Sequence, residues 1–327
     1  MTMTKTTSGG SKILVIGGTG TIGRHIVAAS LEAGHPTLVL VRRSPAPAAA
    51  AAGVDPDKAK LLASLEASGA TLVYGDMNDH ESLVAAIKRA DVVISAVGHR
   101  GTVELDGQLK VVDAIKEAGN IKRFVPSEYG CDVEQAEAAT LEPARSIIAA
   151  KVRVREAVRA AAIPHTFICS YWAHGFMLPR LGDPLVDRPP ATAAVVYGDD
   201  TQRAIFVDEK DMSAVAIRAV DDERALNKIL YVRPAANKLS LGQLVRLWEK
   251  KSGSTLEKLY VSDQQLAKKV QESPFPVNFQ LAMVHSTLVA GVCEQAINPA
   301  VGAEATELYP DMDFLTVDDY LDGLLSI

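Results

Sequence analysis

The sequence is poor in cysteine and in aromatic side chains, and its basic residues form no cluster. The three cysteines, Cys131, Cys169 and Cys293, are odd in number and far apart, and none stands in a metal-ligand spacing. We therefore expect no disulfide framework and no metal site, as is typical of a protein of the reducing cytoplasm. The net charge of −6 and the pI near 5.7, without clustered basic residues, argue against a nucleic-acid partner.

Long apolar runs are also missing. No stretch approaches the roughly 20 apolar residues that span a bilayer, and residues 1–11 are polar and lack the apolar core of a signal peptide. We expect no membrane partner. With 327 residues, of which 48% are hydrophobic and 23% charged, the chain is long enough for one α/β domain and a smaller appended one.

The clearest positive signal lies near the start of the chain. Residues Ile13–Ile16 form an unbroken apolar run, which predicts a parallel strand buried on both faces. Gly17, Gly20 and Gly23 follow at once, at a spacing that permits a tight turn, a close approach to a pyrophosphate and close packing of the next helix. That helix is predicted over residues 21–33, so that Thr21 and Ile22 would present its first amides to the phosphates. This context predicts a dinucleotide site.

The end of the second predicted strand, residues 36–41, bears on the choice of cofactor. An acidic residue there would bond the ribose 2′-hydroxyl group, but this chain has Arg42 and Arg43, whose guanidinium groups suit a 2′-phosphate. The predicted cofactor is therefore NADPH. Lys58 or Lys60, at the start of a helix predicted to run to residue 67, would join Arg42 at the phosphate. Solvated side chains at a strand end are the alternative.

Strands and helices continue to alternate, which predicts an α/β fold with a Rossmann-type doubly wound parallel sheet. The predicted strands cover residues 71–75, 91–97 and 123–125, and the predicted helices cover residues 79–89 and 103–117. Ligands gather at the carboxyl ends of such strands, which nominates Val97, Gly98 and Ser127 for the cofactor and Tyr129 for the substrate. Residues 1–165 are predicted to form the NADP-binding domain. Residues 166–327 would form mainly a smaller α/β substrate domain, with some segments returning to the sheet.

A long helix predicted over residues 143–162 carries the candidate catalytic group. Its apolar stripe consists of Ile147, Val154 and Val158, and Lys151 lies within that stripe. An amine held among aliphatic groups loses hydration, which lowers its pKa and would let it act as a general base. The arginines predicted to lie off the stripe are Arg145, Arg153 and Arg159.

The residue pattern alone leaves the role of Lys151 open, because a lysine at the edge of such a stripe can extend to solvent and be inert. The familiar short-chain dehydrogenase arrangement has a tyrosine four residues before such a lysine, where this chain has Ile147. No Tyr-x-x-x-Lys occurs anywhere in the sequence. Carbonyl reduction with a tyrosine proton donor is therefore not the expected chemistry.

Aromatic and soft side chains concentrate just after a strand predicted over residues 165–171. Tyr171, Trp172, Phe176 and Met177 are plausible lining for an apolar pocket, and core packing is the alternative for Trp172, Phe176 and Met177. Residues 179–190 are predicted to form a loop or lid. Further strands are expected at residues 194–197, 204–207 and 229–233, with helices at 208–220 and 241–251. A helical segment over residues 275–285 would bring His285 to the substrate.

Several motifs together resemble a known family. They are the glycine motif from Gly17 to Gly23, Lys122-Arg-Phe-Val-Pro-Ser-Glu-Tyr-Gly, Leu141-Glu-Pro-Ala-Arg, Ile163-Pro-His-Thr-Phe and Glu307-Leu-Tyr-Pro-Asp. Over nearly its whole length the chain resembles the plant isoflavone reductase-like proteins, atypical short-chain dehydrogenases similar to the NmrA-like group. The resemblance implies NADPH as cofactor, with the three glycines, Arg42 and Lys58 at matching positions. It also implies that Lys151 is the catalytic lysine.

The resemblance further implies reduction of a small phenolic substrate. The expected activity is NADPH-dependent cleavage of a benzylic ether of the phenylcoumaran type, and the alternative is pinoresinol or lariciresinol reduction or another isoflavone reductase-like activity. Cys131 replaces the histidine usual in leucoanthocyanidin reductases, which counts against that activity. Tyr171 and Trp172 replace an asparagine-containing stretch of the phenylcoumaran enzymes. A non-catalytic, NADP-sensing NmrA-like regulator is the alternative of another class, and a homodimer stays open.

Overall fold

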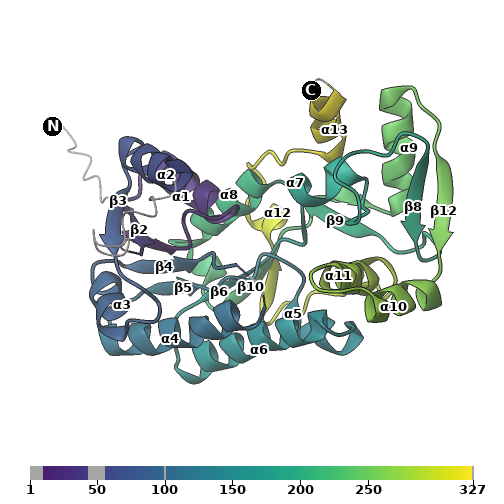
Figure 1. The fold of residues 1–327 in the computed structure, drawn as a ribbon. Coiled ribbons are helices and arrows are strands. Elements are labelled where there is room, and N and C mark those ends of the chain that lie inside the picture. The colour runs from purple at the N-terminus through teal and green to yellow at the C-terminus, as the bar shows by residue number, and fades with distance from the viewer. Residues whose placement is uncertain (1–9, 43–55, 99–100, 326–327) are drawn as a thin grey trace.

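The computed structural model describes residues 10–42, 56–98 and 101–325. Its centre is a parallel five-stranded sheet in the order β3-β2-β1-β4-β5 (Figure 1). Its strands are β1 (Ile13–Ile16), β2 (Thr37–Val41), β3 (Thr71–Tyr74), β4 (Val92–Ser95) and β5 (Arg123–Val125). Every residue of β1, β4 and β5 is buried, as expected of parallel strands covered on both faces.

Later segments of the chain extend this sheet beyond β5. The backbone amide of Phe124 donates to the oxygen of Pro164 at 2.8 Å, and Phe124 forms a parallel bridge with His165. Strand β6 (Thr166–Cys169) then pairs in parallel with β10 (Lys228–Tyr231), and β10 pairs in parallel with β13 (Gly302–Glu304). The predicted α/β fold with a doubly wound parallel sheet is confirmed, and three segments beyond residue 165 belong to it.

Helices cover both faces of the sheet. Helices α3 (His80–Ile87), α4 (Val103–Ala118) and α6 (Ala144–Ala160) lie side by side along one face, below the strands in Figure 1. Helices α1 (Gly23–Glu32) and α8 (Glu209–Ala219) pack together on the other face. Helix α2 (Pro56–Ala67) follows β2 in the chain and contacts β3. This layering brings the loop after β5 to the middle of α6.

A second hydrophobic core lies to the right of the sheet in Figure 1. A parallel pair of strands, β8 (Ala193–Tyr197) and β12 (Glu257–Val261), packs there beside helices. The helices are α7 (His174–Met177), α9 (Leu241–Ser252), α10 (Asp263–Glu272), α11 (Val277–Leu288) and α13 (Val317–Leu325). The short strands β7 (Trp172–Ala173), β9 (Ala204–Val207) and β11 (Lys238–Leu239) form a small mixed sheet. The short helices α5 (Val133–Ala136) and α12 (Ala305–Leu308) lie in connections.

The structure differs from the sequence-based expectation mainly in this second part. The sequence reading did not include β12, α10 or α13, although Ser262 and Gln265 form a capping box that marks the start of α10. Helix α1 begins at Gly23 rather than at Thr21, so Thr21 and Ile22 form the turn that precedes it. Helix α11 begins at Val277 and runs past His285 to Leu288.

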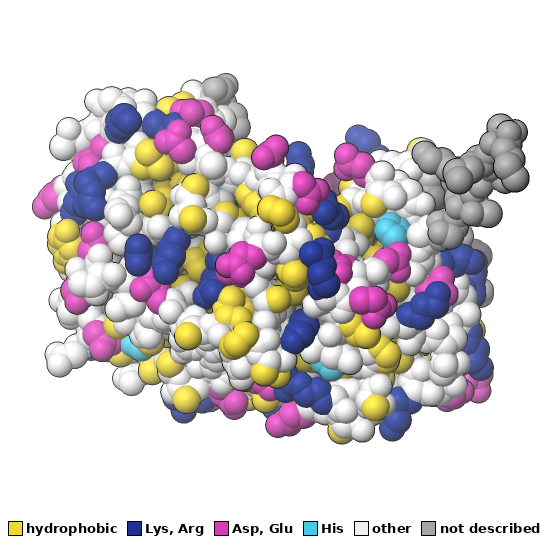
Figure 2. All heavy atoms as spheres, turned by 180° about the vertical axis from the view of Figure 1, so that it is seen from behind, with side chains coloured by type: hydrophobic (Ala, Val, Ile, Leu, Met, Phe, Trp, Pro, Cys, Tyr) yellow, Lys and Arg dark blue, Asp and Glu magenta, His cyan; other side chains and the backbone are white. Residues whose placement is uncertain are grey.

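The surface carries charges of both signs. Basic and acidic side chains are interspersed over the face shown in Figure 2. Among the described residues, none of the helices combines the length and the apolar character needed to cross a membrane.

Candidate functional site

The glycine turn packs backbone against backbone at the carboxyl end of β1. Gly17 has a φ of 83°, and a Cβ atom on it would collide with the carbonyl oxygen of Ala96, just after β4. A Cβ atom on Gly23 would collide with the carbonyl oxygen of Gly17. Both positions therefore require glycine, because any side chain would push the start of α1 away from the sheet.

The start of α1 has the features of an anion site. Ile22 is the N-cap residue, it makes no side-chain capping hydrogen bond, and the first turn of the helix holds no acidic residue. Gly20 and Thr21 are exposed beside it. The positive end of the helix dipole and its first amide groups are therefore not masked by a side chain, as phosphate binding requires.

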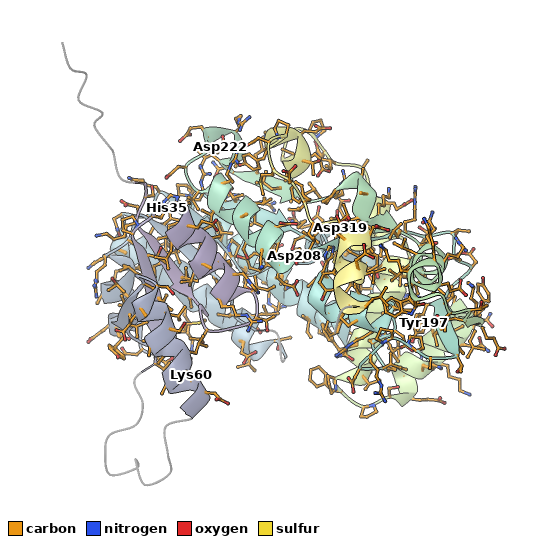
Figure 3. All side chains as sticks on the ribbon, turned by 90° about the horizontal axis from the view of Figure 1, so that it is seen from above. His35, Lys60, Tyr197, Asp208, Asp222 and Asp319 are labelled. Carbon is orange, nitrogen blue, oxygen red and sulfur yellow. The ribbon has the colours of Figure 1, made fainter. Side chains whose placement is uncertain are left out.

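The basic residues proposed for the 2′-phosphate lie at one end of the sheet. Arg42 is exposed directly after β2, and Lys58 is half-buried near the start of α2. Lys60 is exposed and lies near one end of α2 in Figure 3. Arg43 lies outside the described residues. The structure brings Arg42 to the same strand ends as the glycine turn, as the cofactor hypothesis requires.

Two neighbouring loops are tied together beside the glycine turn. The hydroxyl group of Ser127 donates to the carbonyl oxygen of Val97 at 2.9 Å, which joins the loops after β4 and β5. The Ser127 amide donates to Oε1 of Gln108, on α4, at 2.7 Å. Sequence reasoning missed Gln108, a fully buried amide within the apolar pattern of α4. Gly98, which follows Val97, is exposed.

Lys151 lies on the buried face of α6 and reaches the loop after β5. Its Nζ atom donates to the carbonyl oxygen of Glu128 at 2.7 Å. Loss of hydration lowers the pKa of the Lys151 amine, and the carboxylate of Glu128 opposes that change. Ile147, Val154 and Val158 are buried, so the apolar stripe predicted around Lys151 is confirmed.

A buried ion network lies one helical turn beyond Lys151. The Arg155 guanidinium group donates from Nε and Nη2 to the two carboxylate oxygens of Glu128, at 2.7 and 2.6 Å. Its Nη1 atom donates to Asp132 at 2.7 Å and to Glu134 at 2.8 Å. The phenol group of Tyr231, at the end of β10, donates to the other oxygen of Asp132 at 2.6 Å. Sequence reasoning missed this network, although Arg155 stands four residues after Lys151.

Tyr129 and Tyr171 lie on adjoining turns near Lys151. Both have positive φ angles, 42° and 56°, which tyrosine rarely adopts and which often mark functional sites. The Tyr171 amide donates to the carbonyl oxygen of Gly130 at 3.1 Å, which holds the two turns together. Burial raises the pKa of both phenols, so neither is a ready proton donor to solvent near neutral pH.

The other predicted pocket residues lie at three different places. The Trp172 ring stacks on Phe176 with centroids 6.0 Å apart, and its indole nitrogen donates to Oγ1 of Thr287, on α11, at 3.1 Å. Met177 is fully buried in the second hydrophobic core. The Nε2 atom of His285 donates to Oδ1 of Asp263, on α10, at 2.9 Å. Trp172 and Phe176 therefore lie together, whereas Met177 and His285 face other elements.

An apolar cluster adjoins Lys151 on α6. Leu105 of α4 packs with Ile147 and Ala150, and the partly buried ring of Phe279, on α11, covers them. Phe279 also packs against the second core. Ala150 directly precedes Lys151, so this cluster brings apolar surface from α4, α6 and α11 close to Lys151 in the chain. An aromatic substrate would require such a surface.

Two cavities lie away from Lys151. One of about 180 Å³ is lined by polar residues around Asp200 and Arg246. The other, of about 130 Å³, lies between Arg180 and Val195. Neither adjoins the glycine turn or a residue with a lowered amine pKa, so we place the candidate site by the strand ends and Lys151 instead.

Proteins of similar sequence identify the family of this chain. The sequence model of the NmrA-like family matches residues 9–321. The chain belongs to the NmrA-like family. Within that family it is 49% identical to eugenol synthase 1 of Petunia hybrida over 312 residues, which cover 95% of this chain and 97% of the relative. It is also 49% identical over 312 residues to the phenylcoumaran benzylic ether reductase Betv6 of Betula pendula, with the same coverage of 95% and 97%.

Solved structures of NmrA-like relatives have the same fold. The structure described as AtPrR2 with NADP+ and (+)-pinoresinol superposes with a TM-score of 0.87 at 37% identity, and the match covers 95% of this chain and 98% of that one. An isoflavone reductase superposes with a TM-score of 0.89 at 41% identity, covering 96% and 99%. The relatives include a phenylcoumaran benzylic ether reductase and an isoflavone reductase, and this NmrA-like chain is accordingly an oxidoreductase.

Proposed function

We propose that the protein is an NADPH-dependent reductase of phenylpropanoid-derived dimers that cleaves a benzylic ether of the phenylcoumaran type. The observation that carries the proposal is Lys151: an amine with a lowered pKa, held by a backbone carbonyl group beside the strand ends where a dinucleotide would bind. The relatives named as phenylcoumaran benzylic ether reductases support the substrate class.

The residues of the glycine turn fit NADPH. Gly17, Gly20 and Gly23 leave room for a pyrophosphate at the uncapped start of α1, and Arg42 offers a cation for the 2′-phosphate. NADPH would supply the hydride that reduces the substrate. Ser127 and Val97 would form the floor of the site, beside the exposed Gly98. If the assignment of Arg42 is right, Arg42→Asp will reduce the preference for NADPH over NADH in steady-state kinetics.

Lys151 would act on the phenol group of the substrate. Its neutral amine accepts the proton of the para-hydroxyl group, and the phenolate electrons break the bond between the benzylic carbon and the ether oxygen. The ether oxygen takes a proton from solvent, and the ring becomes a quinone methide. Reduction at the benzylic carbon then restores the phenolate, which recovers a proton from Lys151. The reaction therefore consumes one hydride and one proton for each ether bond.

The predicted pocket residues would position the aromatic rings. Trp172 and Phe176, which stack on each other, and the two turns with Tyr129 and Tyr171 would offer aromatic surface to the substrate. Phe279, with Ile147, would add an apolar wall. Met177 and His285 would act through packing, because the first is fully buried and the second bonds Asp263. Holding the benzylic carbon in place would supply much of the rate.

A second candidate is reduction of pinoresinol or lariciresinol. The structural relative with bound pinoresinol favours it, and the same lysine would serve both reactions. Another isoflavone reductase-like activity and a non-catalytic NADP sensor are the remaining alternatives, and a sensor has no use for an amine whose pKa is lowered.

The test is to incubate the purified full chain with NADPH and, separately, with dehydrodiconiferyl alcohol and with pinoresinol, and to identify the products by mass. A gain of two hydrogens on the phenylcoumaran alone supports the proposal. A gain of two hydrogens on pinoresinol alone assigns the protein to lignan reduction instead. Measurable NADPH binding without any product from either compound contradicts both candidates and leaves a different phenolic substrate or the sensor.

A further inference from the structure

The carbonyl oxygen that holds Lys151 belongs to a residue that is itself held by a buried cation. Glu128 offers its backbone oxygen to Lys151 and both carboxylate oxygens to Arg155. The Arg155 side chain is 0% exposed and that of Glu128 is 2% exposed. A bidentate pair between planar groups fixes orientation as well as charge. The position of the Lys151 amine therefore depends on a contact made one turn further along α6.

The pair of Arg155 and Glu128 also determines the electrostatic surroundings of Lys151. A bare carboxylate beside Lys151 would stabilise the protonated amine and so remove the base. The positive charge of the Arg155 guanidinium group offsets that carboxylate, and Arg155 accordingly lowers the pKa of Lys151. Asp132 and Glu134, which also bond Arg155, keep the guanidinium group from being an unpaired buried cation.

We propose that Arg155 is a positioning residue for Lys151: its guanidinium group neutralises the Glu128 carboxylate and fixes the loop whose carbonyl oxygen holds the amine. The proposal rests on the proposed function, because it concerns the base of that reaction. It assigns the ion network a role in the chemistry of the site, beyond joining α6 to the loop after β5.

The other groups around Lys151 do not replace Arg155 in this role. Cys131, after β5, and Cys169, on β6, face the amine as thiols, and burial raises the pKa of both, to about 11 for Cys131. Both are therefore neutral near neutral pH. From α4, Asp106 pairs with Arg153 on the outer face. From α11, His285 bonds Asp263. Glu128 raises and Arg155 lowers the pKa of Lys151.

The proposal can be tested without substrate or cofactor, so its outcome is separate from that of the proposed function. The full-length protein would be labelled with trace acetic anhydride over a pH series, and the acetylation of Lys151 followed by peptide mass spectrometry. The exposed Lys116 of α4 in the same digest is the reference. The variants are Arg155→Met, Glu128→Gln and the double variant, and Arg153→Met, on the exposed face of α6, is the matched control.

We expect Arg155→Met to raise the pKa at which Lys151 becomes reactive by about 1–3 pH units, because the Glu128 carboxylate is then uncompensated. The double variant should return that pKa toward its original value, which a merely structural role would not do. Arg153→Met should leave it unchanged. If Arg155→Met does not fold, Glu128→Gln alone tests the proposal, because removing the carboxylate should lower the pKa of Lys151. The proposal is overturned if the pKa of Lys151 is unchanged in Glu128→Gln. It is also overturned if the double variant raises that pKa as much as Arg155→Met does.

Discussion

The two faces of α6 carry the same kinds of side chain in opposite surroundings. On the buried face, Arg155 bonds Glu128 and Asp132 with almost no exposed area. On the exposed face, Arg153 bonds Asp106 at 2.6 Å with 47% and 37% of the two side chains exposed. The distances are similar, but water screens only the second pair.

This difference teaches that burial, and not the ion-pair distance, decides what a charge on α6 can do. An exposed pair contributes little to stability because solvent stabilises the separated charges almost as well. A buried charge without its partner is costly, and it changes the pKa of its neighbours. Lys151 lies on the buried face, where such changes affect chemistry. The following variants test the contrast, from the largest expected effect to the smallest.

The largest effect is expected on the reaction itself. Lys151→Met removes the base but keeps a long apolar side chain in the stripe, so kcat/KM should fall by about 10²–10⁴-fold with little change in folding. Steady-state kinetics with the phenolic substrate measure it, and circular dichroism checks the fold. Lys116→Met, at an exposed position of α4, is the control and should keep full activity. Normal turnover by the Lys151→Met variant would contradict the proposed mechanism.

The next effect is on stability. Arg155→Met leaves the buried carboxylates of Glu128 and Asp132 without their cation, which should cost about 3–5 kcal/mol in the free energy of unfolding. Urea denaturation at neutral pH measures it. Adding Glu128→Gln should recover part of the loss, because one uncompensated charge is then gone. A loss below about 1 kcal/mol for Arg155→Met would mean that the network behaves like a surface pair.

A smaller effect is expected in the apolar part of the buried face. Ile147 is 5% exposed and packs with Leu105 and Phe279. Ile147→Val removes one methylene group and should cost about 0.5–1.5 kcal/mol in the same denaturation experiment. If the cluster contacts the substrate, KM should rise while kcat changes little. No change in either quantity would show that this position is neither packed nor part of the pocket.

The smallest effect is expected on the exposed face. Arg153→Met breaks the pair with Asp106, and the free energy of unfolding should change by less than about 1 kcal/mol. Repeating the measurement at high salt should shrink the difference further, because salt screens exposed charges. A loss as large as that of Arg155→Met would contradict the contrast between the two faces.

The sheet and the glycine turn were predictable because their signals are local. An apolar run as short as Ile13–Ile16 identifies a strand once a glycine motif follows it, and Gly17 and Gly23 are required by contacts within that motif. Lys151 could be singled out because its apolar neighbours follow the helical period. These features need no knowledge of distant parts of the chain.

The ion network and the second core could not be read in the same way. Arg155 stands on the helical period of the buried face, at i+4 from Lys151, but its partners lie more than 20 residues away along the chain. Without them a buried arginine is indistinguishable from an exposed one. Strand β12 alternates poorly, with three of its five residues exposed, and is identified by its pairing with β8. Tertiary contacts, rather than local pattern, decide both.

The most direct test of the account asks whether the enzyme needs the phenol proton. The phenolic dimer that the protein reduces would be compared with the same compound bearing a methyl ether on the para-hydroxyl group, with NADPH and the unmodified full chain. Because the methylated compound has no proton for Lys151 to accept, we predict that it binds as a competitive inhibitor and gives no reduced product by mass. Reduction of the methylated compound at a rate similar to that of the parent would contradict the role of Lys151 as a general base.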